Sequence, residues 1–265
     1  MAKKTDAPAA ESAAVQLGVG RHALCGQCRH AAEHLAAGRC QPGDRCVRAH
    51  SGRQIDRFFR KLPGEAEAYL GDGFWERRAI AARYAPLEAI LALKNDPDEV
   101  VRRVIASRLT PTAALEMRKD PDREVRITVA HRLNHDDLLA MAGDPDYMVR
   151  VVVARRLSHG KLPRLAQDPE REVRKTVAQR LPPFALSRLL NDPEPEIRRI
   201  VAERALPQDV VLLLEDPDWT VRLAAAENAP RDSVRVLLDD PEPDVRSAAW
   251  RRLAEIDNIS GTTTS

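Results

Sequence analysis

The chain has 265 residues, of which 43% are hydrophobic and 4% aromatic, so it can build an ordinary core but not one centred on large rings. Its 42 Lys and Arg residues nearly cancel its 40 Asp and Glu residues, which argues against a dedicated nucleic-acid-binding protein, because such proteins usually carry a basic excess. No apolar run approaches the roughly 18 residues that cross a bilayer, and the first residues lack the apolar segment of a secretory signal. We therefore expect a cytoplasmic protein with no membrane partner.

The N-terminal part of the chain holds every cysteine. Residues 1–20 are expected to form a disordered tail, and residues 21–50 a small metal-binding module. In a reducing compartment, clustered cysteines more often bind a metal than form disulfides. The spacing C-x2-C-x11-C-x5-C presents four thiolates, which suit either zinc or an iron–sulfur cluster, and the ligand type alone does not separate the two. The predicted ligands are Cys25, Cys28, Cys40 and Cys46.

A second ligand set overlaps the first. Cys28, Cys40, Cys46 and His50 read C-x11-C-x5-C-x3-H, and the last two gaps match a CCCH zinc finger that binds RNA. This alternative leaves Cys25 without a role, and residues 21–50 contain no Phe, Tyr or Trp on which an RNA base could stack. The histidines of the segment are predicted to lie at the surface or beside the ligands. They are His22, His30, His34 and His50.

The rest of the chain is organised by a dipeptide that recurs with a fixed period. Asp-Pro occurs every 24 residues, and an arginine follows six residues after each Asp. A period of this length is typical of a solenoid. The Asp positions are Asp96, Asp120, Asp144, Asp168, Asp192, Asp216 and Asp240, preceded by Asp72, which Gly73 follows. The arginines are Arg78, Arg102, Arg126, Arg150, Arg174, Arg198, Arg222 and Arg246.

Each repeat predicts one long and one short helix. The Asp is expected to be the N-cap and the Pro the first helical residue. Apolar residues at i, i+4 and i+8, such as Val173, Val177 and Leu181, predict an α-helix of about three turns. About ten residues remain before the next Asp-Pro, which suits a 3₁₀ turn or two rather than a second full helix.

The fold class expected is therefore all-α. It is a right-handed superhelical solenoid of about eight to nine 24-residue repeats over residues 51–255, each with one α-helix plus one short 3₁₀-like helix. The metal-binding module precedes it, and residues 256–265 form a C-terminal tail.

The recurring arginine has two interpretations. In the structural one, it pairs with the Asp or the following acid of its own or the next repeat. In the functional one, the arginines form a basic stripe that binds phosphate or an acidic partner. An acid near almost every arginine favours the structural interpretation.

A four-cysteine segment followed by repeats of the form DPDxxVRxxVAxRL resembles the leucine-rich repeat variant (LRV) family of nitrogen-fixing bacteria. The resemblance covers about residues 20–255. It implies a 4Fe-4S cluster held by Cys25, Cys28, Cys40 and Cys46, with a superhelix of alternating α- and 3₁₀-helices. Zinc is the alternative to the cluster.

No P-loop, Rossmann glycine motif, HExxH or nucleophile elbow is found, so we expect neither an enzyme nor catalytic residues. Solenoids usually bind partners along an extended surface. The expected function is an iron–sulfur-containing scaffold for an unidentified protein partner, with a redox or sensing role related to nitrogen fixation. The alternative is a nucleic-acid-binding protein that acts through the zinc finger or an arginine-lined groove.

Overall fold

The structure, a computed structural model, describes residues 25–254. The two expected tails and His22 lie outside these residues. Within them, the backbone forms helices, turns and one isolated antiparallel bridge between Gln41 and Arg45, and it forms no strand. None of the described helices is long and apolar enough to span a membrane. The all-α fold class is confirmed, whereas the right-handed sense of the superhelix stays a prediction.

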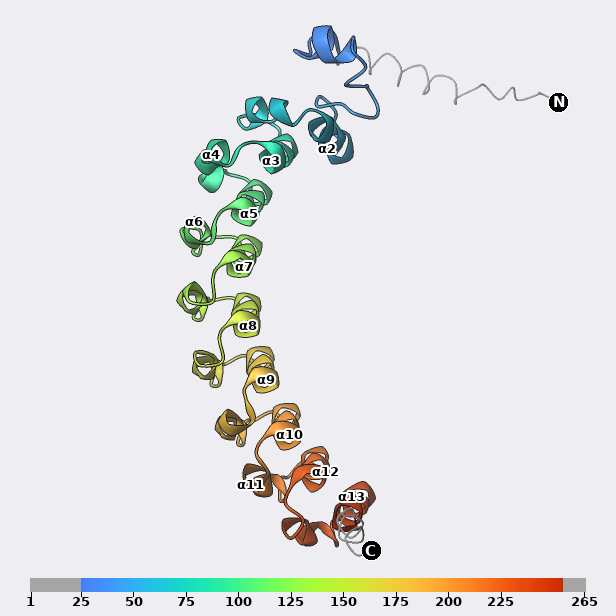
Figure 1. Cartoon of the computed structure of the whole chain (residues 1–265), viewed down its shortest axis with the longest axis vertical. Helices are drawn as coiled ribbons and strands as arrows, with labels where there is room; N and C mark the ends of the chain where they lie inside the picture. The colour runs from blue at the N-terminus through green and yellow to red at the C-terminus, as the bar shows by residue number, and fades with distance from the viewer. Residues whose placement is uncertain (1–24, 255–265) are drawn as a thin grey trace, which may run out of the picture. The chain divides into compact units, whose positions relative to one another are not determined.

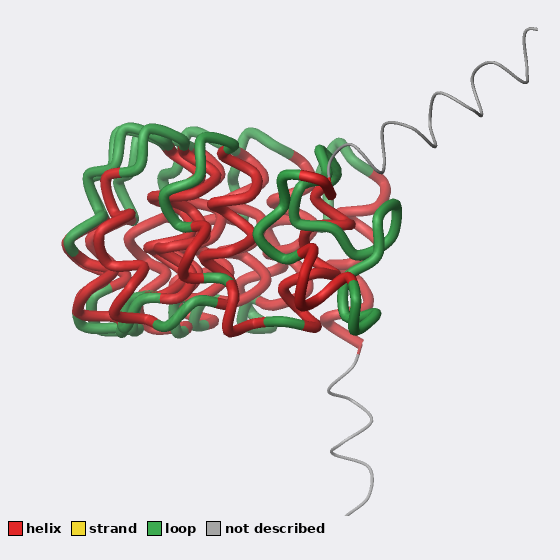
Figure 2. The backbone as a smooth tube through the Cα atoms, turned by 90° about the horizontal axis from the view of Figure 1, so that it is seen from above, coloured by secondary structure: helices red, strands yellow, loops and turns green. Residues whose placement is uncertain are grey.

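The chain divides into two compact units, Met1–Arg132 and Leu133–Ser265. In each unit, long α-helices alternate with short helices (Figures 1 and 2). The helices of the first unit are η1 (Ala31–Leu35), α2 (Gly52–Lys61), η2 (Pro63–Glu65), η3 (Glu67–Tyr69), α3 (Trp75–Tyr84), α4 (Leu87–Ile90), η4 (Leu91–Asn95), α5 (Glu99–Arg108), α6 (Pro111–Leu115) and α7 (Arg123–Arg132). Those of the second unit are η5 (Asp137–Met141), α8 (Tyr147–Arg156), η6 (Leu162–Leu165), α9 (Arg171–Arg180), η7 (Pro183–Leu189), α10 (Pro195–Arg204), α11 (Pro207–Val210), η8 (Val211–Leu213), α12 (Trp219–Asn228), η9 (Ser233–Leu237) and α13 (Pro243–Ala254).

The long helices bury the predicted apolar stripe. In α9, Val173, Val177 and the C-cap Leu181 are fully buried, and so is the adjacent Ala178, whose small side chain allows the next helix to approach closely. The long helices of successive repeats pack on one another, from α2 to α3, α5 and α7 in the first unit and from α8 to α9, α10, α12 and α13 in the second. Each repeat therefore completes its core with its neighbours.

The short helices are mostly 3₁₀ turns, as the spacing predicts. Three of them, α4, α6 and α11, form a single α-helical turn instead. The alternation of α- and 3₁₀-helices implied by the family resemblance is thus present in both units.

The start of each long helix differs from the prediction. Asp96 and Pro97 precede α5 without joining it, and Asp98 is the N-cap, whose carboxylate accepts hydrogen bonds from the N–H groups of Val100 and Val101 at 2.9 and 3.4 Å. The carboxylate of Asp96 instead accepts from the N–H of Asp98 at 2.9 Å, which fixes the turn before the helix. The assignment of Asp96 as cap and Pro97 as first helical residue was wrong because that carboxylate serves an ion pair.

This ion pair joins each repeat to the next. The Arg174 guanidinium donates to both carboxylate oxygens of Asp192 at 2.7 and 3.1 Å, and to the carbonyl of Asp168 in its own repeat at 2.8 Å. The structural interpretation of the arginines is confirmed for the pairs the structure describes. Equivalent pairs are Arg78–Asp96, Arg102–Asp120, Arg150–Asp168, Arg198–Asp216 and Arg222–Asp240.

A second set of arginines, in the last turn of the long helices, caps the helix of the preceding repeat. Arg180 donates to the carbonyls of Ala154 and Leu157 at 2.6 and 2.8 Å, at the end of α8. These carbonyls have no partner within their own helix, so a neighbouring arginine satisfies them. Arg132 and Arg204 act in the same way on the repeats before them.

Candidate metal centre

The backbone between residues 25 and 50 turns sharply at three places. The segment η1 is a π-helical turn, in which the N–H groups of His34 and Leu35 both bond to the carbonyl of His30, at 2.9 and 3.1 Å. Gly38 and Gly43 have positive φ angles of 63° and 87°, which favour glycine. The first ends the helical turn before Cys40, and the second closes the Gln41–Arg45 bridge before Cys46.

These turns bring the four predicted ligands together. Cys25, Cys28, Cys40 and Cys46 line one cavity, whose walls include Leu35, Pro42, Val47 and Phe58. None of these four cysteines is in a disulfide, and all four are partly buried. His50 is exposed, packs on the ring of Phe74 at 5.6 Å, and is not among the residues lining this cavity. The geometry therefore assembles the four-cysteine set rather than the CCCH set.

The electrostatics of the cavity suit a cationic centre. Burial raises the pKa of the Cys40 thiol, and the neighbouring Cys28, Cys46 and Cys25 raise it further, while Arg45 opposes them. The pKa of Cys25 is raised by the same two causes. Thiolates bind metals, and a bound cation removes their mutual repulsion.

Four thiolates that line one cavity can bind either one metal ion or an iron–sulfur cluster. The cavity and its donor set fit an iron–sulfur cluster, which Cys25, Cys28, Cys40 and Cys46 would hold.

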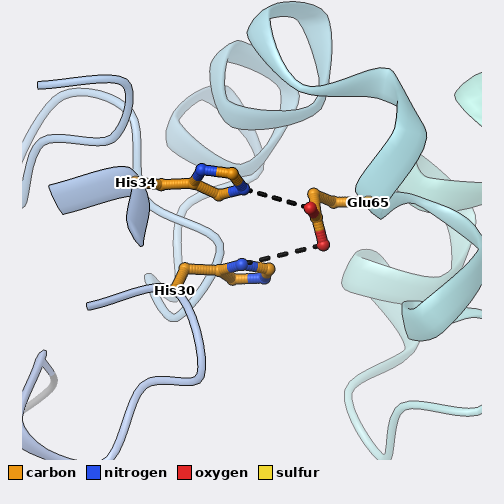
Figure 3. A group of neighbouring side chains, drawn as sticks. All are labelled: His30, His34 and Glu65. Atoms are coloured by element: carbon orange, nitrogen blue, oxygen red, sulfur yellow. Dashed lines mark hydrogen bonds and ion pairs between the residues drawn. The ribbon is translucent and has the colours of Figure 1, made fainter. Parts of the chain in front are cut away.

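Two histidines that the sequence placed at the surface or beside the ligands are buried. His30 and His34 are 4% and 3% exposed, and both face the carboxylate of Glu65 (Figure 3). His34 Nε2 lies 3.0 Å from Glu65 Oε1, and His30 Nδ1 lies 3.7 Å from Glu65 Oε2. The hydrogen bond with His34 lowers the pKa of Glu65, and burial lowers the pKa of His30. Their spacing of four residues is compatible with two side chains on one helical face, but it does not identify Glu65 as their partner.

Arg77 ties the module to the first repeats. Its Nε donates to the carbonyl of Val47, next to Cys46, at 2.6 Å, and its Nη1 donates to both carboxylate oxygens of Asp72 at 2.7 and 2.8 Å. One repeat before Arg78, the sequence has Gln54, so Asp72 lacks the usual arginine partner. Arg77 takes that role, and the Cys46 N–H donates to the carbonyl of Gln54 at 3.2 Å. The cluster loop is thus bonded directly to α2 and α3.

Comparison with known proteins identifies both parts. Residues 19–68 match the LRV protein FeS4 cluster family, and residues 171–194 and 219–242 match the leucine rich repeat variant family. A solved structure described as a leucine-rich repeat variant with a novel repetitive protein structural motif is 53% identical, with a TM-score of 0.80, over 86% of this chain and 98% of that chain.

A curated relative is an uncharacterized 27.7 kDa protein in the nifB 3′ region of Rhodobacter capsulatus. It is 40% identical over 90 residues, which are 34% of this chain and 36% of that protein. The chain therefore spans about a third of the length of this relative. The N-terminal module is an iron–sulfur cluster domain, and the chain belongs to the leucine-rich repeat variant family.

Proposed function

We propose that this protein is a cytoplasmic scaffold whose repeats bind a protein partner. Its 4Fe-4S cluster, held by Cys25, Cys28, Cys40 and Cys46, either transfers electrons or senses redox conditions. The observation that carries the proposal is the convergence of all four thiols on one cavity that is bonded to the first repeats. When bound, such a cluster supplies a one-electron redox centre whose potential depends on burial and hydrogen bonding.

The repeat surface of the second unit supports a protein partner. Each of its last three short-helix segments exposes one large apolar side chain: Phe184 at 71%, Leu212 at 70% and Val236 at 61%. The buried cores of protein interfaces are enriched in aromatic and apolar side chains, and these three recur in successive repeats. The repeating arginines, in contrast, already bond to carboxylates and carbonyls, so they are poorly placed to bind phosphate. These features favour a protein over a nucleic acid.

The relative's place in the nifB 3′ region supports a role related to nitrogen fixation. The cluster supports the same role, since iron–sulfur clusters serve electron transfer.

The cluster part is tested on protein purified without oxygen. We expect about four iron and four sulfide per chain, and a one-electron couple detected by electron paramagnetic resonance. A colourless protein that holds one zinc on these cysteines would contradict the proposal and favour the zinc alternative.

The partner part is tested with a photo-crosslinking amino acid placed at Leu212, in extracts of nitrogen-fixing cells. The matched control carries the same label at Gln208, which is exposed and polar on the adjacent α11. We expect one discrete protein to be captured at position 212 and not at 208, and less capture when Phe184→Ser is added. Capture of the same proteins from both positions would contradict a specific partner surface.

A further inference from the structure

The pair of buried histidines has a geometry that its hydrogen bonds alone do not explain. Each imidazole turns one nitrogen toward Glu65, and the three ligand atoms lie within 4.8 Å of one another (Figure 3). The rings are stacked nearly parallel, with centroids 5.1 Å apart and an interplanar angle of 14°. Two imidazoles and one carboxylate facing a common point form a donor set that proteins use for divalent transition metals.

The far side of each ring also matches a metal site. His30 Nε2 lies 2.8 Å from the hydroxyl of Tyr69, and His34 Nδ1 lies 3.5 Å from the carboxylate of Glu33. A histidine that binds a metal usually donates its other N–H to such a group, which fixes the tautomer and the ring orientation. His30 therefore has a hydrogen-bond partner for the nitrogen that would not bind metal, and the corresponding nitrogen of His34 has a carboxylate nearby.

The proton count at His34 favours an ion over a plain hydrogen bond. If neutral His34 donates from Nε2 to Glu65, its Nδ1 carries a lone pair, and this buried atom has no hydrogen-bond partner. A lone pair facing the carboxylate of Glu33 is unfavourable. A metal on Nε2 moves the proton to Nδ1, which then donates to Glu33. Protonation of both nitrogens is the competing way to satisfy this atom.

We propose that His30 Nδ1, His34 Nε2 and Glu65 bind a divalent transition-metal ion such as Zn²⁺, in a second site beside the cysteine cavity, which His30 also lines. Nitrogen and oxygen donors select ions of this kind, whereas the cysteines favour sulfur-bound iron. Ligand atoms of a tetrahedral zinc site are about 3.4 Å apart, whereas these three lie within 4.8 Å of one another. Side-chain rotations that move the ligand atoms by about an ångström would therefore complete the site. Because Glu65 belongs to η2 and the histidines to the cluster module, the ion would clamp the module to the first repeat.

The test uses cluster-loaded protein dialysed against Zn²⁺ without oxygen, with zinc, iron and sulfide measured together. We expect wild type to gain one zinc per chain with no loss of iron, and His34→Gln and Glu65→Gln to gain none. The matched control, His50→Gln, removes an exposed histidine and should bind zinc as wild type does. Glu33→Gln keeps all three ligands and should weaken zinc binding by about 10- to 100-fold.

Zinc absorption-edge spectroscopy separates this site from the cysteines. We expect only nitrogen and oxygen neighbours at about 2.0–2.2 Å, and no sulfur at about 2.3 Å. Three results would overturn the proposal: no zinc uptake by wild type, uptake matched by iron loss with sulfur neighbours, or equal uptake by Glu65→Gln. Circular dichroism of each variant establishes that the loss of zinc is not a loss of fold.

Discussion

The repeats and the cluster module satisfy their buried polar groups in different ways. In the repeats, one arrangement recurs: an arginine bonds to a carboxylate of the next repeat and to a carbonyl of its own. In the module, each contact occurs once, and three buried nitrogens, His34 Nδ1, Arg39 Nε and Arg45 Nε, have no hydrogen-bond partner. The polar contacts of the repeats therefore recur from one repeat to the next, whereas those of the module are single contacts.

At the boundary between the cluster module and the repeats, a residue of one region replaces the usual partner in the other. At Asp72, the arginine of a preceding repeat is replaced by Arg77, which spans the carboxylate and the carbonyl of Val47. The first repeats therefore take part of their polar partners from the cluster loop. Loss of the cluster should reach α2 and α3 but not the second unit.

The largest expected effect comes from Cys28→Ser. Loss of one of four ligands should abolish the cluster and unfold the module, because metal binding and folding are coupled in segments with so small a core. Hydrogen exchange should show lost protection over residues 25–50, weaker protection in α2 and α3, and no change over residues 133–254. Iron analysis checks the ligand loss, and His50→Ala, in the same loop, is the control. Unchanged protection of the module without iron would contradict its dependence on the cluster.

Removal of an inter-repeat arginine tests the self-sufficiency of the repeats. Side chains of Arg174 and Asp192 are 9% and 2% exposed, so Arg174→Ala leaves a buried carboxylate without its partner. We expect the free energy of unfolding to fall by about 3–5 kcal/mol. The surface pair Arg199–Glu203, 43% and 41% exposed, offers the control, where Arg199→Ala should cost about 0.5 kcal/mol or less. Urea unfolding measures both, and similar losses would mean that the pairs contribute through surface charge alone.

Regular features of the repeats could be predicted from the sequence because they recur. The apolar stripe, the short second helix and the Arg–Asp pairing each follow from spacing that is present many times. The start of the helix was misplaced, since both Asp96 and Asp98 can cap a helix, and only the position of Arg78 in space shows which carboxylate is already engaged.

In the module, the chemistry of the cysteines was predictable but their surroundings were not. Four thiols in one short segment indicate a common centre whatever the backbone does. The burial of His30 and His34 depends on Glu65, which lies about 30 residues away in a degenerate repeat. A contact of this kind occurs once and has no period, so no pattern in one sequence reports it.

Acid should weaken the inter-repeat pairs in a defined direction. Hydrogen bonds from Arg222 lower the pKa of Asp240 below its usual value near 3.9, although burial opposes this. A lowered pKa in the folded state adds stability above the unfolded-state pKa, and this contribution is lost as the pH falls through the folded-state pKa. Asp240→Asn should therefore destabilise the second unit at pH 7, and its difference from wild type should shrink below about pH 4.

Urea unfolding at several pH values between 7 and 3 measures this difference. Asp239→Asn, at the exposed neighbouring position, is the control and should match wild type throughout. A difference between Asp240→Asn and wild type that stays constant down to pH 3 would show that the carboxylate charge does not hold the pair.

The smallest expected effect distinguishes the two acids before α5. Asp98→Ala removes an N-cap and should cost about 1 kcal/mol, because the N–H groups of Val100 and Val101 can turn to water. Asp96→Ala should cost several times more, about 3 kcal/mol, since it leaves the guanidinium of Arg78 without its carboxylate, where its side chain is 11% exposed. Urea unfolding of the two variants gives the ratio. Equal losses would show that the Arg78–Asp96 ion pair stabilises the repeats no more than one helix cap does.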